Sequence, residues 1–251
     1  MDDLIIGRCG KVATIRLNRP PHNFFDAELL RGIADALADA DADSEVCVTL
    51  LSAEGRSFCA GADFTRSTGE QDRARIIYGE AARIFDRMKP LVAAVGGPAV
   101  GGGLGLALAA DFRVVNAQAR FHANFAALGL HPGFALTLTL PALIGRQRAR
   151  DMLLSARRVM GEEAAAIGLA DCFAATNPLD TEAMAFAQRM ALNAPLALAS
   201  IANAVPRIGG IEARAAMAEE LAEQAQLFAT EDFREGVRAA AEHRLANFRG
   251  C

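Results

Sequence analysis

Two short, continuous apolar runs constrain the fold of this chain more than any other feature of its sequence. Residues 46–51 (VCVTLL) and 91–95 (LVAAV) have almost no polar side chain, a pattern typical of strands that are covered on both faces in a parallel sheet. Residues 11–17 and 112–115 predict two further strands, and helical patterns lie between the strands. This alternation predicts an α/β fold with parallel or near-parallel strands.

The helices are indicated by apolar residues spaced three and four positions apart. One helix follows Asp26, whose side chain suits an N-cap, and presents its apolar face over residues 29–37. A second, over residues 76–88, is ended by Pro90, and a third is expected over residues 101–110. The C-terminal third is helical almost throughout, over residues 147–154, 162–167, 181–192, 196–205, 211–229 and 232–247.

The apolar content is high enough for a sizeable core, because 52% of the 251 residues are hydrophobic and 22% are charged. The most apolar stretch, residues 91–110, is interrupted by glycines and by Pro98, so it does not read as a membrane span. The chain opens with Asp2 and Asp3 and lacks the pattern of a secretory signal. We therefore expect a cytoplasmic protein without a membrane partner.

Charge and cysteine usage argue against other kinds of partner. The net charge is −4 and no concentrated basic patch stands out, which disfavours nucleic acid. The five cysteines are odd in number, scattered and never in a C-x-x-C pair, which argues against a disulfide framework and a zinc cluster. We expect reduced thiols and no bound metal.

Two glycine-bearing loops each follow an apolar strand: residues 57–63 (SFCAGAD) and 96–105 (GGPAVGGGLG). Small residues let the backbone approach a ligand, and N–H groups at a strand-to-helix turn can bind an anion or a developing oxyanion. The alternative is that each loop is only a tight turn. The second loop lacks the G-x-G-x-x-G spacing and has no phosphate-loop lysine, so it predicts no nucleotide site.

Taken together, these segments resemble the crotonase (enoyl-CoA hydratase/isomerase) superfamily. The resemblance implies a spiral of ββα units over residues 1–195, followed by a helical trimerisation region over residues 196–251, in a homotrimer or a hexamer made of two trimers. It is carried by residues 13–23 (ATIRLNRPPHN), 58–63, 96–110, 121–133, 161–171 (GEEAAAIGLAD) and 230–248.

The resemblance also implies a binding site for an acyl-CoA thioester, with coenzyme A as part of the substrate and no separate cofactor. The backbone N–H groups of Ala62 and Gly102 match the pair that holds the thioester carbonyl in the family. Charge on that oxygen develops during the reaction, which is why two aimed donors matter. The other implied substrate-binding residues are Ala60, Gly61, Asp63, Gly101, Asn124, Phe125 and Tyr78.

The chain departs from the family pattern where proton transfer is expected. The two glutamates that hydratases need match Gly105 and Phe125 here, and a catalytic aspartate of other members matches Gly133. We therefore expect a reaction other than hydration: hydrolysis, decarboxylation or isomerisation. His122 and His131 are candidate acid–base residues, although His122 could simply pack beside a strand and His131 could stabilise a turn.

Two other functions remain open at this point. The chain could be an acyl-CoA-binding protein that has lost catalysis, or a C–C hydrolase acting on a diketone without coenzyme A. Asp63 could order its loop rather than bind substrate, and Tyr78 could be a half-buried core residue. Cys59, next to the predicted N–H donors, is expected to be a small apolar filler.

Overall fold

The structure is a computed structural model that describes residues 2–62, 70–205 and 207–251. Within these ranges a larger sheet has the strand order β1–β2–β3–β4–β6–β9, and a smaller sheet has the order β5–β7–β8. In the larger sheet β1 and β2 are antiparallel and the other neighbours are parallel. The strands are β1 (Leu4–Cys9), β2 (Val12–Leu17), β3 (Val48–Ala53), β4 (Leu91–Val95), β5 (Pro98–Val100), β6 (Phe112–Val115), β7 (Arg120–His122), β8 (Arg158–Met160) and β9 (Cys172–Phe173).

The apolar runs form the centre of the larger sheet, which confirms the predicted α/β class. Every residue of β4 is buried, and in β3 only the last residue is partly exposed. Because successive side chains point to opposite faces of a sheet, Leu50 and Leu51 belong to different apolar clusters, one on each side.

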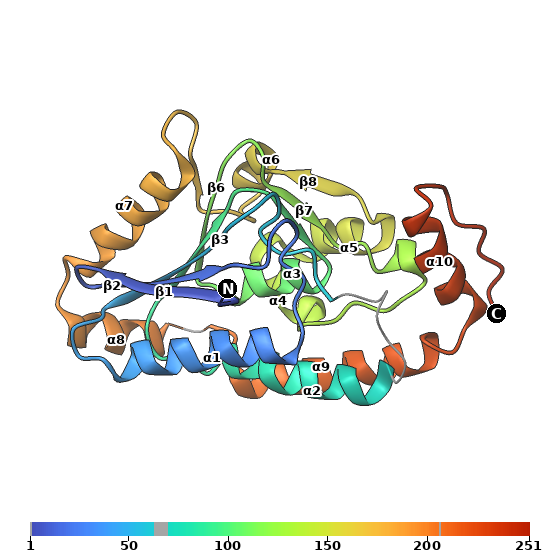
Figure 1. Cartoon of the computed structure of the whole chain (residues 1–251), viewed down its shortest axis with the longest axis horizontal. Coiled ribbons are helices and arrows are strands. Elements are labelled where there is room, and N and C mark those ends of the chain that lie inside the picture. Colours follow the sequence, from blue (N-terminus) through green and yellow to red (C-terminus); the bar gives the residue numbers. More distant parts are fainter. Residues whose placement is uncertain (1, 63–69, 206) are drawn as a thin grey trace.

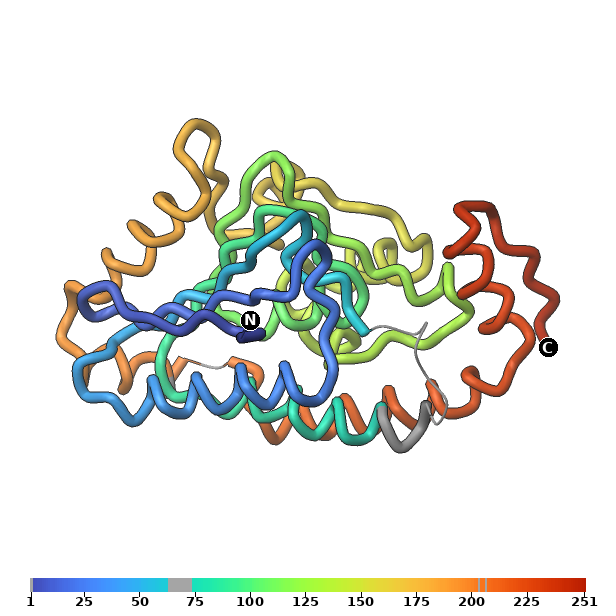
Figure 2. Tube along the Cα trace, in the orientation of Figure 1, coloured from blue at the N-terminus to red at the C-terminus, as the bar shows by residue number. Residues whose placement is uncertain are grey.

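Helices cover both faces of this sheet. On one side α1 (Ala27–Ala42), α2 (Glu70–Ile84) and α9 (Gly210–Leu227) run side by side, and on the other α7 (Leu179–Ala191) packs against β2, β3, β4 and β6 (Figures 1 and 2). The predicted start of α1 is confirmed, since the Asp26 carboxylate accepts a hydrogen bond from the N–H of Leu29 at 2.9 Å.

The predicted helices of the C-terminal third are confirmed as α5 (Arg146–Ser155), α6 (Gly161–Ala166), α7, α8 (Pro195–Ala204), α9 and α10 (Glu231–Ala241). One helix was missed, α4 (Leu136–Ile144), because it contains two threonines and has Pro141 inside it. Helices α9 and α10 fold back onto the rest of the chain, against α2 and the 3₁₀ turn η2 (Ala126–Leu128) respectively. The division of the chain at residue 195 stays a prediction.

The edge hairpin of β1 and β2 was only half predicted. Strand β1 turns into β2 at Gly10, which has a φ of +59° that suits glycine. Most of β1 is exposed, including Ile5 and Ile6. It shows no polar–apolar alternation, so no period-2 signal marked it.

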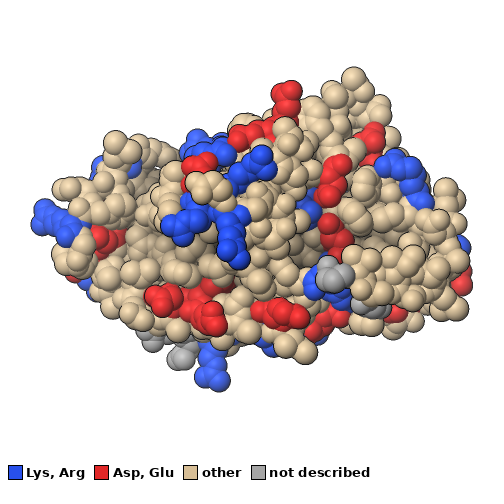
Figure 3. All heavy atoms as spheres, turned by 180° about the vertical axis from the view of Figure 1, so that it is seen from behind, with Lys and Arg blue, Asp and Glu red and all other residues tan. Residues whose placement is uncertain are grey.

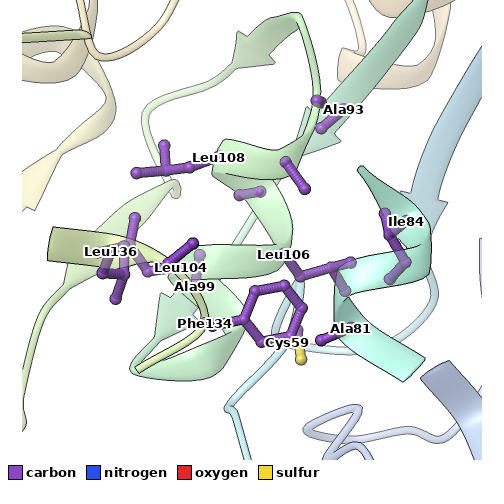
Figure 4. Packing of buried hydrophobic residues seen from close by; sticks show 14 of the residues in the cluster. Cys59, Ala81, Ile84, Ala93, Ala99, Leu104, Leu106, Leu108, Phe134 and Leu136 are labelled. Atoms are coloured by element: carbon purple, nitrogen blue, oxygen red, sulfur yellow. The ribbon is translucent and has the colours of Figure 1, made fainter. Parts of the chain in front are cut away.

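A short, almost entirely buried helix, α3 (Gly102–Ala109), occupies the middle of the molecule. Figure 4 shows its side chains Leu104, Leu106 and Leu108 within a cluster that also contains Ile84 from α2 and Phe134. Since α3 is buried on nearly all sides, the position of its N-terminus is set by tight packing.

The two glycine-bearing loops are joined by backbone hydrogen bonds just before α3. The N–H of Cys59 donates to Pro98 O at 3.1 Å, and the N–H of Val100 donates to Cys59 O at 3.0 Å. The backbones are so close that a Cβ on Gly103 would lie 2.0 Å from Cys59 O, and one on Gly97 would lie 2.3 Å from Arg56 O. Both glycines are therefore required by this contact.

The surface carries charge unevenly. The sequence predicts no concentrated basic patch, yet exposed arginines are frequent on α5 and β8: Arg146, Arg148, Arg150 and Arg158. Figure 3 shows basic side chains gathered near the middle of one face, with acidic side chains around them. Among the described residues, no helix combines the length and apolar character needed to cross a membrane.

The loop contact predicts a large difference between two Gly→Ala substitutions. Gly103→Ala should lower the free energy of unfolding by about 3 kcal/mol, because its methyl group would collide with the Cys59 carbonyl. Gly79→Ala is the control: it lies in α2 with no atom within 4 Å of its added Cβ, and should gain up to about 1 kcal/mol from helix propensity. Urea unfolding measures both, and similar midpoints for the two variants would contradict the proposed packing.

Candidate active site

A cavity of about 260 Å³ lies where the two glycine-bearing loops meet α2, α9 and α10. Most of its lining is apolar, with five phenylalanines among the described residues. The lining residues are Phe24, Phe25, Ala60, Gly61, Ala62, Ala74, Ile77, Tyr78, Val100, Gly101, Gly102, Asn124, Phe125, Leu128, Gly133, Phe134, Gln224, Phe228, Val237, Ala240 and Ala241. In this described set no side chain carries a charge.

The first loop reaches the cavity through Ala60, Gly61 and Ala62. Gly61 O accepts a hydrogen bond from the N–H of Phe25 at 3.0 Å, which fixes the loop from outside. Gly61 has a φ of +86°, and a Cβ there would lie 2.9 Å from Val100 O and 3.4 Å from Gly102 N. The backbone of the first loop therefore lies directly against the N-terminus of α3.

The second loop supplies that N-terminus. Gly101 adopts a φ of +54° as the N-cap of α3, and the first helical N–H groups of any helix have no partner inside the helix. Neither the N–H of Gly102 nor that of Ala62 has an acceptor within the part of the chain that the structure describes. Two unpaired backbone donors thus border one apolar cavity.

Cys59 lies just behind these donors but is unsuited to act as a nucleophile. Burial raises the pKa of its thiol to about 12, although the N–H of Gly61 partly offsets this by donating to the sulfur. A thiol with such a pKa stays protonated near neutral pH, and the thiolate is the reactive form. The side chain is fully buried among apolar residues, as expected for an apolar filler.

Phe134 fills the space beside Gly105. A Cβ on Gly105 would lie 2.5 Å from Phe134 Cβ, so no larger side chain fits there without moving this ring. Phe134 also packs against Phe25, with ring centroids 5.6 Å apart. Phe125, buried and at the N-cap of η2, contributes a further ring to the cavity.

Tyr78 provides a polar atom in this apolar lining. Its hydroxyl donates to Gln224 Oε1 at 2.8 Å. A Cβ on Gly133 would lie 1.8 Å from Tyr78 Oη, so the hydroxyl occupies the place where a side chain at position 133 would begin. Burial raises the pKa of Tyr78, and the nearby Glu220 carboxylate raises it further, so the phenol is neutral at physiological pH.

Glu220 binds the backbone of residues 135–137, which follows the part of the cavity lining that contacts this hydroxyl. Its buried carboxylate accepts hydrogen bonds from the N–H groups of Ala135 and Thr137, at 2.8 and 2.9 Å, and from Thr137 Oγ1 at 2.6 Å. Ala135 is the N-cap of α4 and has no oxygen in its side chain with which to cap the helix. Glu220, from α9, thus caps the N-terminus of α4 in place of a side chain at the N-cap position.

This cap holds a strained segment. Phe134 and Ala135 have φ values of +61° and +56°, a conformation that is costly for residues with a side chain. Glu220 accepts a hydrogen bond from the N–H of Ala135, and the hydroxyl of Tyr78 packs against Gly133, the residue just before the turn. Contacts from two separate helices therefore maintain the left-handed turn that places the Phe134 ring in the cavity.

The predicted histidines lie outside the described lining. His122 Nε2 is 2.9 Å from Ala156 O, and burial is the main cause of its lowered pKa. His131 Nδ1 is 2.9 Å from Pro132 O, and its own carbonyl accepts from Gln224 Nε2 at 2.8 Å. A catalytic role for either histidine stays a prediction.

The other predicted residues are placed as follows. Ala62, Gly102, Ala60, Gly61, Gly101, Asn124, Phe125 and Tyr78 all line the cavity. Asp63 lies outside the described residues.

A protein-family comparison accounts for this combination of fold and loops. The model of the family described as enoyl-CoA hydratase/isomerase matches residues 7–250. The chain belongs to this family.

Curated relatives match over nearly their whole length. The chain is 31% identical to the short-chain-enoyl-CoA hydratase of Clostridium acetobutylicum, over 97% of this chain and 96% of that one. It is 33% identical to the 2,3-dehydroadipyl-CoA hydratase of Escherichia coli, over the full length of both. A crystal structure of an enoyl-CoA hydratase from Mycobacterium avium subsp. paratuberculosis has 30% identity and a TM-score of 0.87, covering 99% of each chain.

Sequence reasoning did not find Phe134, Glu220 and Gln224. A signal for the two polar residues exists, because they continue the three-and-four spacing of the buried Ala213 and Met217 along α9. Polar side chains at core positions of a helix indicate a buried polar contact. Their partners lie more than 80 residues away, so the sequence pattern could not identify them.

The buried carboxylate predicts a pH-dependent stability difference. Burial raises the pKa of Glu220 above its ordinary value of 4.5, so the folded state holds this proton more tightly than the unfolded state. That stabilisation is fully present below the ordinary carboxyl pKa and is lost as pH rises through the raised one. Relative to Glu220→Gln, the natural protein should therefore lose stability as pH rises from about 4.5 towards neutrality.

Urea unfolding across that pH range measures this difference. Glu219→Gln is the matched control, since Glu219 is the adjacent residue of α9 and is exposed, and it should leave the pH profile unchanged. A constant difference between the natural protein and Glu220→Gln at every pH would show that this carboxyl does not titrate differently in the folded state.

Proposed function

We propose that this chain binds an acyl-CoA thioester in the cavity and polarises the thioester carbonyl with the N–H groups of Ala62 and Gly102. The observation that carries the proposal is a pair of N–H donors with no acceptor among the described residues, on two loops that are hydrogen-bonded to each other beside an apolar cavity. Hydrogen bonds from such donors strengthen in a site from which water is excluded. The names of the relatives, which are hydratases of enoyl-CoA thioesters, support the same substrate class.

We further propose that the reaction is not hydration. Hydration needs side chains that activate water and deliver a proton, and the positions matched to them carry Gly105 and Phe125. The ring of Phe134 occupies the space beside Gly105, and no acidic side chain occurs among the described lining residues. These features are unsuited to two-carboxylate chemistry.

Of the three candidate reactions, decarboxylation needs the fewest acid–base groups from the protein. When a 2-carboxyacyl thioester loses CO₂, the electrons of the broken C–C bond form the enolate, so no protein base has to remove a proton. The enolate oxygen receives the developing charge, which the two N–H groups would stabilise, and the α-carbon is then protonated from solvent. An apolar cavity also favours the loss of a charged carboxylate as neutral CO₂. Hydrolysis and isomerisation each need a proton acceptor in addition.

Ala62→Pro removes one of the two donors. The variant should turn over its thioester about 100-fold more slowly, because one lost oxyanion donor costs about 3 kcal/mol of barrier. Ala62→Ser keeps the N–H and is the control, and thermal unfolding checks that both variants are folded. Unchanged turnover in Ala62→Pro would contradict the role of this amide.

A panel of CoA thioesters, with mass detection of products, tests the reaction itself. We expect a 2-carboxyacyl-CoA to lose CO₂ and crotonyl-CoA to be left unhydrated. Hydration of crotonyl-CoA at a rate typical of enzymes, about 10 per second, would overturn the non-hydratase proposal. Tight binding of every thioester with no turnover would instead identify a binding protein, and hydrolysis of a diketone without binding of CoA would identify a C–C hydrolase.

The exposed face of α8 supports self-association, which we propose as part of this function. Leu196 and Ile201 are 88% and 58% exposed, and wide apolar surfaces of this kind favour interfaces between subunits. We expect trimers or hexamers in sedimentation at micromolar concentration. A clean monomer would contradict this assembly.

A further inference from the structure

The direction of one hydrogen bond in the cavity limits what the acyl group can offer to Tyr78. The hydroxyl of Tyr78 lies in a lining that is otherwise mainly apolar, so its hydrogen-bonding capacity weighs heavily in any choice between acyl groups. Whether the hydroxyl can still donate a hydrogen bond, or can only accept one, depends on the partners that it already has.

The chain of partners begins at the carbonyl of His131. A carbonyl oxygen can only accept a hydrogen bond, so the amide group of Gln224 must turn its Nε2 towards His131 O, at 2.8 Å. This orientation points Gln224 Oε1 at Tyr78, and Oε1 can likewise only accept. The O–H of Tyr78 therefore donates to Gln224, at 2.8 Å.

Gln224 cannot easily adopt the opposite orientation. It is 3% exposed, and rotating its amide would bring Oε1 against the carbonyl oxygen of His131, which leaves two acceptors facing each other without a proton. The proton of the phenol is thus committed, and only acceptor capacity remains on its oxygen.

We propose that Tyr78 is a specificity-determining residue that selects acyl groups carrying a hydrogen-bond donor, and that Gln224 sets this preference by fixing the direction of the Tyr78 hydroxyl. The proposal rests on the proposed thioester site. The acyl groups it favours carry a hydroxyl that reaches Tyr78. Groups that present only an acceptor there, such as a ketone, would face an oxygen with no proton to offer.

The experiment measures binding of straight-chain acyl-CoA thioesters to the full chain by calorimetry. At each carbon position in turn, the substituent is a hydroxyl, a ketone or a methyl group, which differ in hydrogen bonding more than in size. At the position that reaches Tyr78, the hydroxyl form should bind about 10-fold more tightly than the other two, the effect of one additional hydrogen bond in a site closed to water.

Two variants separate the roles of the two residues. Tyr78→Phe should abolish the preference for the hydroxyl. Gln224→Met should free the phenol proton to donate, so that the ketone form gains affinity while the hydroxyl form keeps its own. Gln226→Met is the matched control, because Gln226 is exposed on the same helix, and it should preserve the preference of the natural protein.

The outcomes distinguish this inference from the proposed function. If the thioesters bind but the three substituents are equivalent at every position, or if the preference survives in Tyr78→Phe, Tyr78 does not select the acyl group and only this inference falls. If Gln224→Met leaves the ketone form weak, the direction of the hydroxyl is not set as described. If no thioester binds, both the proposed function and this inference are contradicted.

Discussion

The close approach of two backbones, at Cys59 and Gly103, is the constraint on which the rest of this site depends. Their separation leaves no room for a Cβ, and the hydrogen bonds between the loops lock them in register. Ala62 follows within three residues of Cys59, and Gly102 precedes Gly103. These two N–H groups are therefore held by the same contact that joins the loops, and neither can move without disturbing the packing of α3.

The electrostatics of the cavity follow from its apolar lining. No charged side chain lies in the described lining, and few of its polar groups are free to reorient. Most of them are backbone amides or side chains that already have hydrogen-bond partners. In such surroundings a fixed N–H donor stabilises a developing negative charge more effectively than water does, because it needs no reorientation. The same apolar character makes a free carboxylate expensive there, which agrees with Gly105 and Phe125 as occupants of this region.

Sequence reasoning recovered the parts of the fold that have a local cause. The continuous apolar runs of β3 and β4, the N-cap of α1 and the periodic C-terminal helices all leave a signature within a few residues. The sequence also identified both loops, since their glycines are close together. It missed β1 and α4, whose patterns are overridden by tertiary contacts: β1 by pairing along its whole length with β2, and α4 by the capping carboxylate of Glu220. It also missed β9 and the smaller sheet of β5, β7 and β8, because strands of two or three residues are too short to show a period.

The part of the cavity lining around Phe134 could not be predicted, because its shape results from contacts between distant segments. The ring of Phe134 lines the cavity only because residues 134 and 135 adopt a left-handed turn that their own sequence disfavours. That turn persists because Glu220, from α9, accepts the N–H of Ala135, and the hydroxyl of Tyr78, from α2, packs against the neighbouring Gly133. Since α9 also fixes Tyr78 through Gln224, one helix determines both the shape of this side of the cavity and the direction of the Tyr78 hydroxyl. A change along α9 would therefore alter the choice of acyl group while leaving the two N–H donors in place.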